Sequence, residues 1–150
     1  MAALLPWLEA NWFSFLQSVG IVGGLLFTAA SVRRDTKARR INDMLKLKEE
    51  HRELWSELHR RSDLARITTT KVDLIGTPVT PVEEMFLNIA IVHFHTGWQM
   101  NKMGVVIARK GAEADIKWFF NLPIAHAVWE ASKNYREPEF VKFVEKCLRE

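Results

Sequence analysis

Histidine is the residue type in this chain best suited to metal binding or proton transfer, and the chain has five. They are His51, His59, His93, His95 and His126. His93 and His95 form an H-x-H pair, which can chelate a metal on a strand, but on a helix the two rings point about 160° apart. His126 and Glu130 share a helix face, and no further ligands follow at matching spacings. The sequence therefore predicts no metal site.

Other catalytic signatures are missing from the sequence. Gly20, Gly23 and Gly24 lie in an apolar run rather than after a strand, so they do not form a phosphate-binding loop. Glu83 and Glu84 lie at a predicted helix start, where carboxylates complement the helix dipole. There is no nucleophile elbow and no zinc-protease motif. We predict a non-enzymatic protein without a cofactor; an active site assembled from scattered residues is the alternative.

His51, Cys147 and the tryptophans are expected to be packing residues rather than catalytic or ligand-binding groups. His51 lies in the middle of an apolar arc, where a hydrogen-bonded core histidine is expected. Cys147 is the only cysteine, so it cannot form an internal disulfide, and its position in a helical pattern predicts a small core residue. The six tryptophans are interpreted as core and interface anchors.

The positive charge of the chain is concentrated in one short segment. Of 21 Lys and Arg side chains, five lie in residues 33–40: Arg33, Arg34, Lys37, Arg39 and Arg40. Residues 41–150 carry 16 basic and 16 acidic side chains. The sequence pI near 9.2 therefore does not predict a nucleic-acid partner, and the basic segment instead directly follows an apolar run, where a topology signal belongs.

That apolar run is the strongest signal in the sequence. Residues 12–32 carry no charge, and 21 residues of helix at ~1.5 Å each are close to the ~30 Å hydrocarbon core of a bilayer. Trp7 and Trp12 lie at one edge, at the depth that indole rings prefer. We predict an uncleaved transmembrane helix with the N-terminus, which carries Glu9, outside and residues 33–150 in the cytoplasm.

Three alternatives to a transmembrane helix fit the residues of this run less well. A cleaved signal peptide requires basic residues before the run, and here they follow it. A buried core helix explains the apolar content but not the charge at one end and the tryptophans at the other. A helix lying in the membrane interface requires a polar face that uncharged residues do not supply.

One face of the predicted span carries small and polar residues within an arc of about 80°. These are Gln17, Gly20, Gly24, Thr28 and Ser31. The G-x-x-x-G spacing allows close approach of a second helix, and Gln17 can hydrogen-bond across it. We predict a helix-packing face, although glycine and serine are also simply common in membrane helices.

The remainder of the chain is predicted to form several helices. Residues 41–61 have an amphipathic pattern, and the chain has no Pro or Gly from residue 25 to 75, so the membrane helix can continue into them. Ser62 and Asp63 can cap a short turn over residues 64–67. Thr80-Pro81-Val82-Glu83 is a capping box, and the helix that it opens, residues 81–102, is apolar on most sides and is interpreted as the buried central helix.

Beyond Gly104 the pattern predicts helices over residues 112–121 and 123–135 and a last one opened by Glu137-Pro138. Residues 67–72 are the best strand candidate and have no evident partner strand. The predicted fold class is all-α. The predicted organisation is an N-terminal segment with a transmembrane helix (1–32), a basic juxtamembrane stop (33–40) and a cytoplasmic helical domain (41–150).

Several short motifs are spread along the chain. They are the stretch from Ser18-Val19-Gly20 to Arg33-Arg34, Arg52-Glu53-Leu54-Trp55, Leu64-Ala65-Arg66, Pro81-Val82-Glu83-Glu84, Leu122-Pro123, Val128-Trp129-Glu130 and Phe140-Val141-Lys142-Phe143-Val144-Glu145. In these motifs the chain resembles a bacterial family of small single-span membrane-anchored helical proteins of unknown function. The family implies a fold and a location but no activity.

We expect a non-enzymatic accessory or scaffold protein of the bacterial inner membrane. Its expected partners are membrane lipid, which the basic segment would contact, and another transmembrane helix from a copy of itself or from a membrane complex. A small homo-oligomeric membrane effector or channel is the second hypothesis, and a membrane-tethered enzyme is the third.

Overall fold

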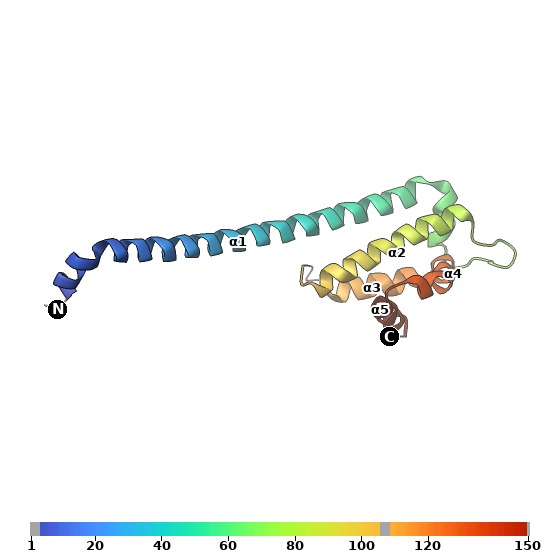
Figure 1. The fold of residues 1–150 in the computed structure, drawn as a ribbon. Coiled ribbons are helices and arrows are strands. Elements are labelled where there is room, and N and C mark those ends of the chain that lie inside the picture. Colours follow the sequence, from blue (N-terminus) through green and yellow to red (C-terminus); the bar gives the residue numbers. More distant parts are fainter. Residues whose placement is uncertain (1–3, 106–108, 150) are drawn as a thin grey trace. The chain divides into compact units, whose positions relative to one another are not determined.

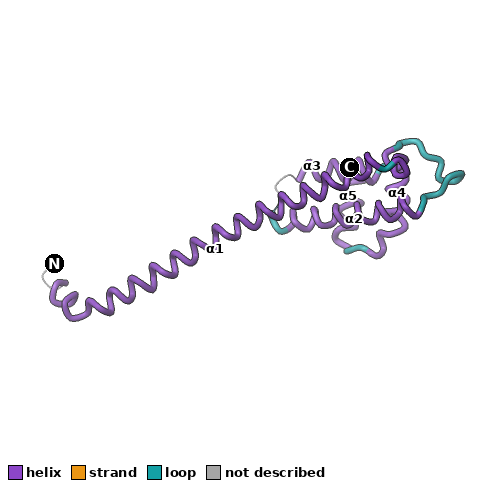
Figure 2. The backbone as a smooth tube through the Cα atoms, turned by 90° about the horizontal axis from the view of Figure 1, so that it is seen from above, coloured by secondary structure: helices purple, strands orange, loops and turns teal. Residues whose placement is uncertain are grey.

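The computed structural model describes residues 4–105 and 109–149, and across these ranges every regular element is a helix (Figures 1 and 2). This confirms the all-α prediction. The elements are α1 (Leu4–Arg60), η1 (Ser62–Thr68), α2 (Pro81–Lys102), α3 (Arg109–Phe120), α4 (Pro123–Ser132), η2 (Lys133–Tyr135) and α5 (Pro138–Arg149), where η marks a 3-10 helix. Residues 67–72, the best strand candidate in the sequence, do not form a strand: this stretch is the end of η1 and an extended loop.

The chain divides into two compact units, residues 1–42 and 43–150, with the boundary inside α1. The first unit is the N-terminal part of α1. Its apolar side chains face outward: Leu25 is 66% exposed and Phe27 is 75% exposed. α1 is the one helix within the described ranges that is long and apolar enough to cross a membrane, with a mean hydropathy of 1.7 over an 18-residue window of which nothing is buried.

The second unit has a core of packed aromatic rings. Phe94 of α2 lies against Phe119 and Phe120 of α3, with ring centroids 4.9 and 5.7 Å apart. Phe120 meets the edge of Trp129 at 5.0 Å, and Trp129 in turn contacts Phe140 of α5 at 5.9 Å. These contacts join α2, α3, α4 and α5 into one core, and Figure 1 shows these four helices gathered together. Cys147 is buried in this core, as predicted.

The C-terminal part of α1 belongs to the second unit and packs on this core. Leu58 is buried, and the Trp55 ring lies 5.6 Å from Trp118 and 6.3 Å from Phe119. A methyl of Leu47 lies 3.8 Å from where a Cβ on Gly97 would be. This part of α1 therefore depends on bulky aromatic side chains for its attachment.

The start of α2 confirms the predicted capping box. Thr80 Oγ1 accepts a hydrogen bond from the Glu83 amide at 3.2 Å, and Glu83 Oε2 accepts one from the Thr80 amide at 2.8 Å. Pro81 occupies the first turn, where its missing N–H costs nothing. Glu83 is fully buried, and Arg66 of η1 approaches its second oxygen at 3.5 Å. The cap thus also connects α2 to η1.

Three local predictions need correction. Ser62 and Asp63 do not cap the turn that follows, because Asp63 instead accepts two hydrogen bonds from Arg61, at 3.2 and 2.7 Å. The helix expected over residues 123–135 tightens into a 3-10 turn at Lys133, a common form of helix end. α3 begins at Arg109, before the predicted start at residue 112, and includes Gly111.

The interpretation of α2 as the buried central helix holds for only one of its sides. Phe86, Leu87, Ala90 and Ile91 are buried, but Met85, Ile89 and Val92 are more than half exposed. The reason is that α3, α4 and η1 cover only one side of α2. An apolar strip on the other side is left without a neighbour.

Candidate functional site

The predicted helix-packing face lies on the first unit. Gln17, Gly20, Gly24 and Thr28 are exposed, and Ser31 is half-buried. A Cβ added at Gly20 or Gly24 would meet nothing within 4 Å, so a second helix has room to approach. What occupies this face stays a prediction.

Several hydroxyl groups of this unit donate to carbonyls of the same helix. Ser18 Oγ donates to the carbonyl of Ser14, and Thr28 Oγ1 donates to the carbonyl of Gly24, each at 2.8 Å. Gln17 differs from them, since its amide has no hydrogen-bond partner in the described part of the chain. Gln17 is therefore a side chain of this face whose amide remains available to a neighbouring helix.

The five basic residues of the predicted stop segment are all exposed. Arg33, Lys37 and Arg40 share one side of the helix within about 60°, while Arg34 and Arg39 lie on other sides. Together they surround the helix with positive charge directly after the apolar run. The side chains of Trp7 and Glu9, at the other end of the run, lie outside the described residues.

The sequence did not predict a hydrogen-bonded pair of histidines in the second unit. His51 Nδ1 lies 3.1 Å from His93 Nε2, and Trp55 Nε1–H donates to His51 Nε2 at 2.8 Å. Because His51 Nε2 accepts from Trp55, the proton of neutral His51 is on Nδ1 and is donated to His93 Nε2. The chain Trp55–His51–His93 therefore requires both imidazoles to be neutral, and it connects α1 to α2.

The environment of His93 favours this neutral form. Burial lowers the pKa of His93 below its usual value, and the neighbouring His51 lowers that pKa further, while Glu50 acts in the opposite direction. His51 is hydrogen-bonded as expected, but it is half-buried rather than enclosed in the core.

A cavity of about 120 Å³ lies beside the two histidines. Its lining is mostly apolar and includes Leu47, Phe94 and Ile116, with Asp115 and Asn101 as polar members. Within the described residues no three His, Cys, Asp or Glu side chains come together as a metal would require. Nucleophile, base and oxyanion donors do not converge at this cavity.

His93 and His95 point to different sides of α2, as the helical spacing predicted. His95 Nε2 lies 3.0 Å from Glu137 Oε2, and Gln99 donates to the same oxygen at 3.3 Å. The hydrogen bond from His95 is the main reason why the pKa of Glu137 lies below its usual value. Since the His95 ring also packs 4.7 Å from Phe140, this pair fastens the start of α5 to α2. His126 and Glu130 are exposed, and Glu130 accepts a hydrogen bond from Lys133.

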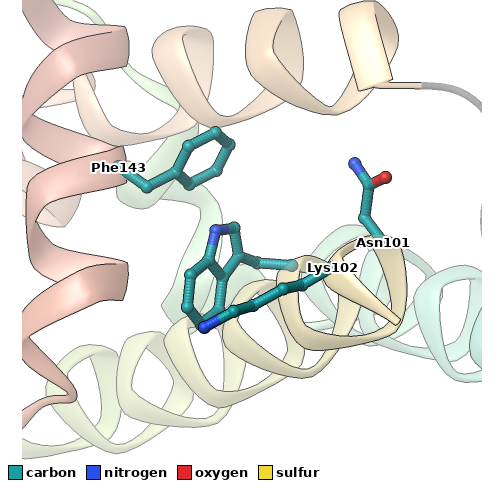
Figure 3. Close-up of a pocket in the computed structure, with 4 residues that line it drawn as sticks. Asn101, Lys102 and Phe143 are labelled. Carbon is teal, nitrogen blue, oxygen red and sulfur yellow. The ribbon is translucent and has the colours of Figure 1, made fainter. Parts of the chain in front are cut away.

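A second hollow, of about 300 Å³, is lined by Trp98, Asn101, Lys102 and Phe143 (Figure 3). The Lys102 ammonium lies 5.2 Å from the Trp98 ring centroid and also pairs with Glu139. That hydrogen bond raises the pKa of Lys102. The charge is thus already neutralised by a carboxylate and a ring, so the hollow offers no unpaired cation to an anionic ligand.

The chain matches no protein-family model, no curated protein sequence and no solved structure. The family resemblance seen in the sequence motifs accordingly stays a prediction.

Proposed function

We propose that this protein is a non-enzymatic accessory subunit of the bacterial inner membrane, anchored by one helix and presenting a helical interaction domain to the cytoplasm. The observation that carries the proposal is the outward-facing apolar surface of α1 in the first unit. No part of its most apolar window is buried.

The energetics of this surface support a membrane. Soluble proteins seldom expose contiguous apolar patches above a few hundred Å², because each Å² kept in water costs ~25 cal/mol. Trp12, Phe13, Leu16, Leu26 and Phe27 are each between 59% and 75% exposed on this single helix. Hydrocarbon removes that cost, and the internally satisfied hydroxyls of Ser18 and Thr28 suit a medium without water.

The basic residues after the apolar run support the orientation. Positive charge flanking a span is retained on the cytoplasmic side, where it also contacts anionic headgroups. Arg33, Arg34, Lys37, Arg39 and Arg40 would then lie at the inner surface, with residues 41–150 beyond them.

A binding role, rather than catalysis, fits the second unit. The His51–His93 and His95–Glu137 pairs connect helices to one another, and the described lining of the cavity beside the two histidines includes no serine, threonine, cysteine or lysine. In the described part of the chain, the apolar strip on α2 and the small-residue face of α1 are exposed and would supply binding surfaces.

The function is tested by affinity purification of the full chain from native membranes in a mild detergent. The expected result is a stoichiometric membrane-protein partner that survives stringent washing. Recovery of the chain alone, together with ion permeability of liposomes that contain it, would instead favour a homo-oligomeric channel.

The orientation is tested with reporter fusions at residue 150. We expect activity from a cytoplasmic reporter and none from a periplasmic one. Replacement of the five basic residues by Gln should produce mixed orientations. A wild-type fusion that is active only in the periplasm would contradict the proposal.

A further inference from the structure

The outward strip of α2 is an apolar feature of the second unit that no described element covers. Met85, Ile89 and Val92 are 57%, 55% and 51% exposed and follow a spacing of i, i+4, i+7. They therefore form one continuous line along the helix. The opposite side of α2 packs in the core, and this packing fixes the position of the strip.

A groove runs between this strip and the C-terminal part of α1. Its α1 side is formed by Leu54 and three glutamates, Glu50, Glu53 and Glu57, and its volume is about 320 Å³. Ile89 and Val92 line this groove and also a second hollow of about 410 Å³, which extends to Met85 and Arg136. The two hollows are therefore neighbouring parts of one surface.

The shape of the groove fits a helix. His51 lies beside His93 and Leu47 beside Gly97, so α1 and α2 run antiparallel here. Each contributes residues spaced i, i+3, i+4 and i+7, which are the ridges that a third helix packs between. From Met85 to Thr96 the groove spans about 16 Å, or three turns of helix at ~1.5 Å per residue.

The charge on the two sides differs. Glu57 is paired with Arg61, but Glu50 and Glu53 have no ion-pair partner among the side chains that the structure describes. On the far side of the strip is one cation, Arg136, whose guanidinium donates to Asn88 Oδ1 at 2.6 Å. An occupant thus meets unpaired negative charge along the α1 edge.

We propose that this groove is the docking site for an amphipathic helix of a partner protein, with an apolar stripe on Met85, Ile89 and Val92 and with Lys or Arg along the edge that faces Glu50 and Glu53. The inference rests on the proposed function, because it assigns the surface and the partner chemistry of the cytoplasmic module.

The experiment uses the full chain in nanodiscs of zwitterionic lipid and a fluorescent 18-residue helical peptide with leucine on one face and lysine along one edge. Binding is read by anisotropy against empty nanodiscs. We expect saturable binding that weakens with added salt. An otherwise identical peptide with glutamate in place of lysine should bind at least about tenfold more weakly, since its charges would repel Glu50 and Glu53.

Two pairs of matched variants locate the site. Ile89→Asp should weaken binding about tenfold or more, and Ile89→Ala severalfold, as for a central apolar anchor. Ile75→Asp is the control, because Ile75 is 96% exposed in a loop away from the groove. Glu50→Gln with Glu53→Gln should weaken binding about threefold to fivefold, whereas Glu49→Gln, on the same helix but outside the groove lining, should not. Circular dichroism verifies that each variant is folded.

Equal binding to wild type and Ile89→Ala, equal binding of the two peptides, or no saturable binding would each overturn the docking site. The proposed function is tested separately by the native partner. If that partner co-purifies equally well with Ile89→Asp, the docking site is wrong and the accessory role stands. If no partner co-purifies with wild type, the accessory role itself is wrong.

Discussion

Leucine and phenylalanine occupy opposite positions in the two units of this chain. Leu25 and Phe27 of the first unit are 66% and 75% exposed, whereas Leu87 and Phe120 of the second unit are fully buried. The second unit satisfies its apolar side chains by packing helices around them, and the first has no helix of its own to pack against. The comparison teaches that the same residue types require a different medium in each unit: protein interior in the second and, under the proposed function, hydrocarbon in the first.

The largest effect should come from opening the core of the second unit. Trp129 is fully buried, and its Nε1–H donates to Glu145 at 3.3 Å. Trp129→Ala should cost ~3–5 kcal/mol of unfolding free energy, measured by urea unfolding of the full chain in detergent micelles. Phe27→Ala, which removes an aromatic ring from the first unit, should leave the unfolding midpoint unchanged. Similar losses in both variants would remove the distinction between the units.

A charged side chain introduced into each unit should have a large effect in the first unit and a small one in the second. Leu26→Arg in the middle of the apolar run should cost ~2.5–3.5 kcal/mol of membrane insertion and reduce the fraction that resists alkaline extraction from membranes. Ile75→Arg, on an exposed loop of the second unit, should leave that fraction unchanged. If Leu26→Arg is retained as well as Ile75→Arg, the run does not cross a membrane.

The next effect concerns the predicted packing face of the first unit. Gly24→Ile should disrupt helix association more than Gln17→Leu, because a membrane hydrogen bond is often worth only ~0.6 kcal/mol, while a bulky side chain blocks close approach. Fluorescence transfer between labelled chains in liposomes measures this. Gly23→Ile, about 100° around the helix, is the control. An equal effect at positions 23 and 24 would mean that the span is only an anchor.

A threonine hydroxyl should matter in one unit and not in the other. Thr80→Ala removes the cap of α2 and should cost ~1 kcal/mol of unfolding free energy, whereas Thr80→Ser should restore it. Thr28→Ala removes a hydroxyl that bonds only to its own helix, at the Gly24 carbonyl. We expect no change in urea unfolding for Thr28→Ala, and a loss comparable to that of Thr80→Ala would contradict the comparison.

The smallest effect is a dependence on pH that only the second unit has. The pKa of His93 lies below its unfolded value of 6.5, so the unfolded chain binds its proton first as the pH falls. The contribution of His93 to stability is therefore complete above that value and is lost as the pH falls toward the lowered pKa. Urea midpoints at pH ~7.5 and ~5.5 should differ less in His93→Gln than in wild type. An unchanged difference would mean that the His51–His93 contact does not carry this dependence.

Local interactions are the part of this protein that its sequence alone determined. The capping box joins Thr80 to Glu83, which is only three residues away, so its hydrogen bonds depend on the local sequence at the start of α2. The uncharged run of residues 12–32 is equally local, since length and composition suffice to recognise it. The opposite directions of His93 and His95 follow from helical geometry.

Contacts between distant segments were decided only by the tertiary structure. His51 and His93 are 42 residues apart in sequence, and the apolar pattern around each of them does not indicate that the two are in contact. Asp63 could have capped η1, but its carboxylate is taken by Arg61. Met85, Ile89 and Val92 are apolar residue types that are typical of a core. They are exposed because no described helix covers this side of α2. Whether a side chain is buried depends on which segments pack around its helix. A sequence pattern predicts the helix but not the segments that pack against it.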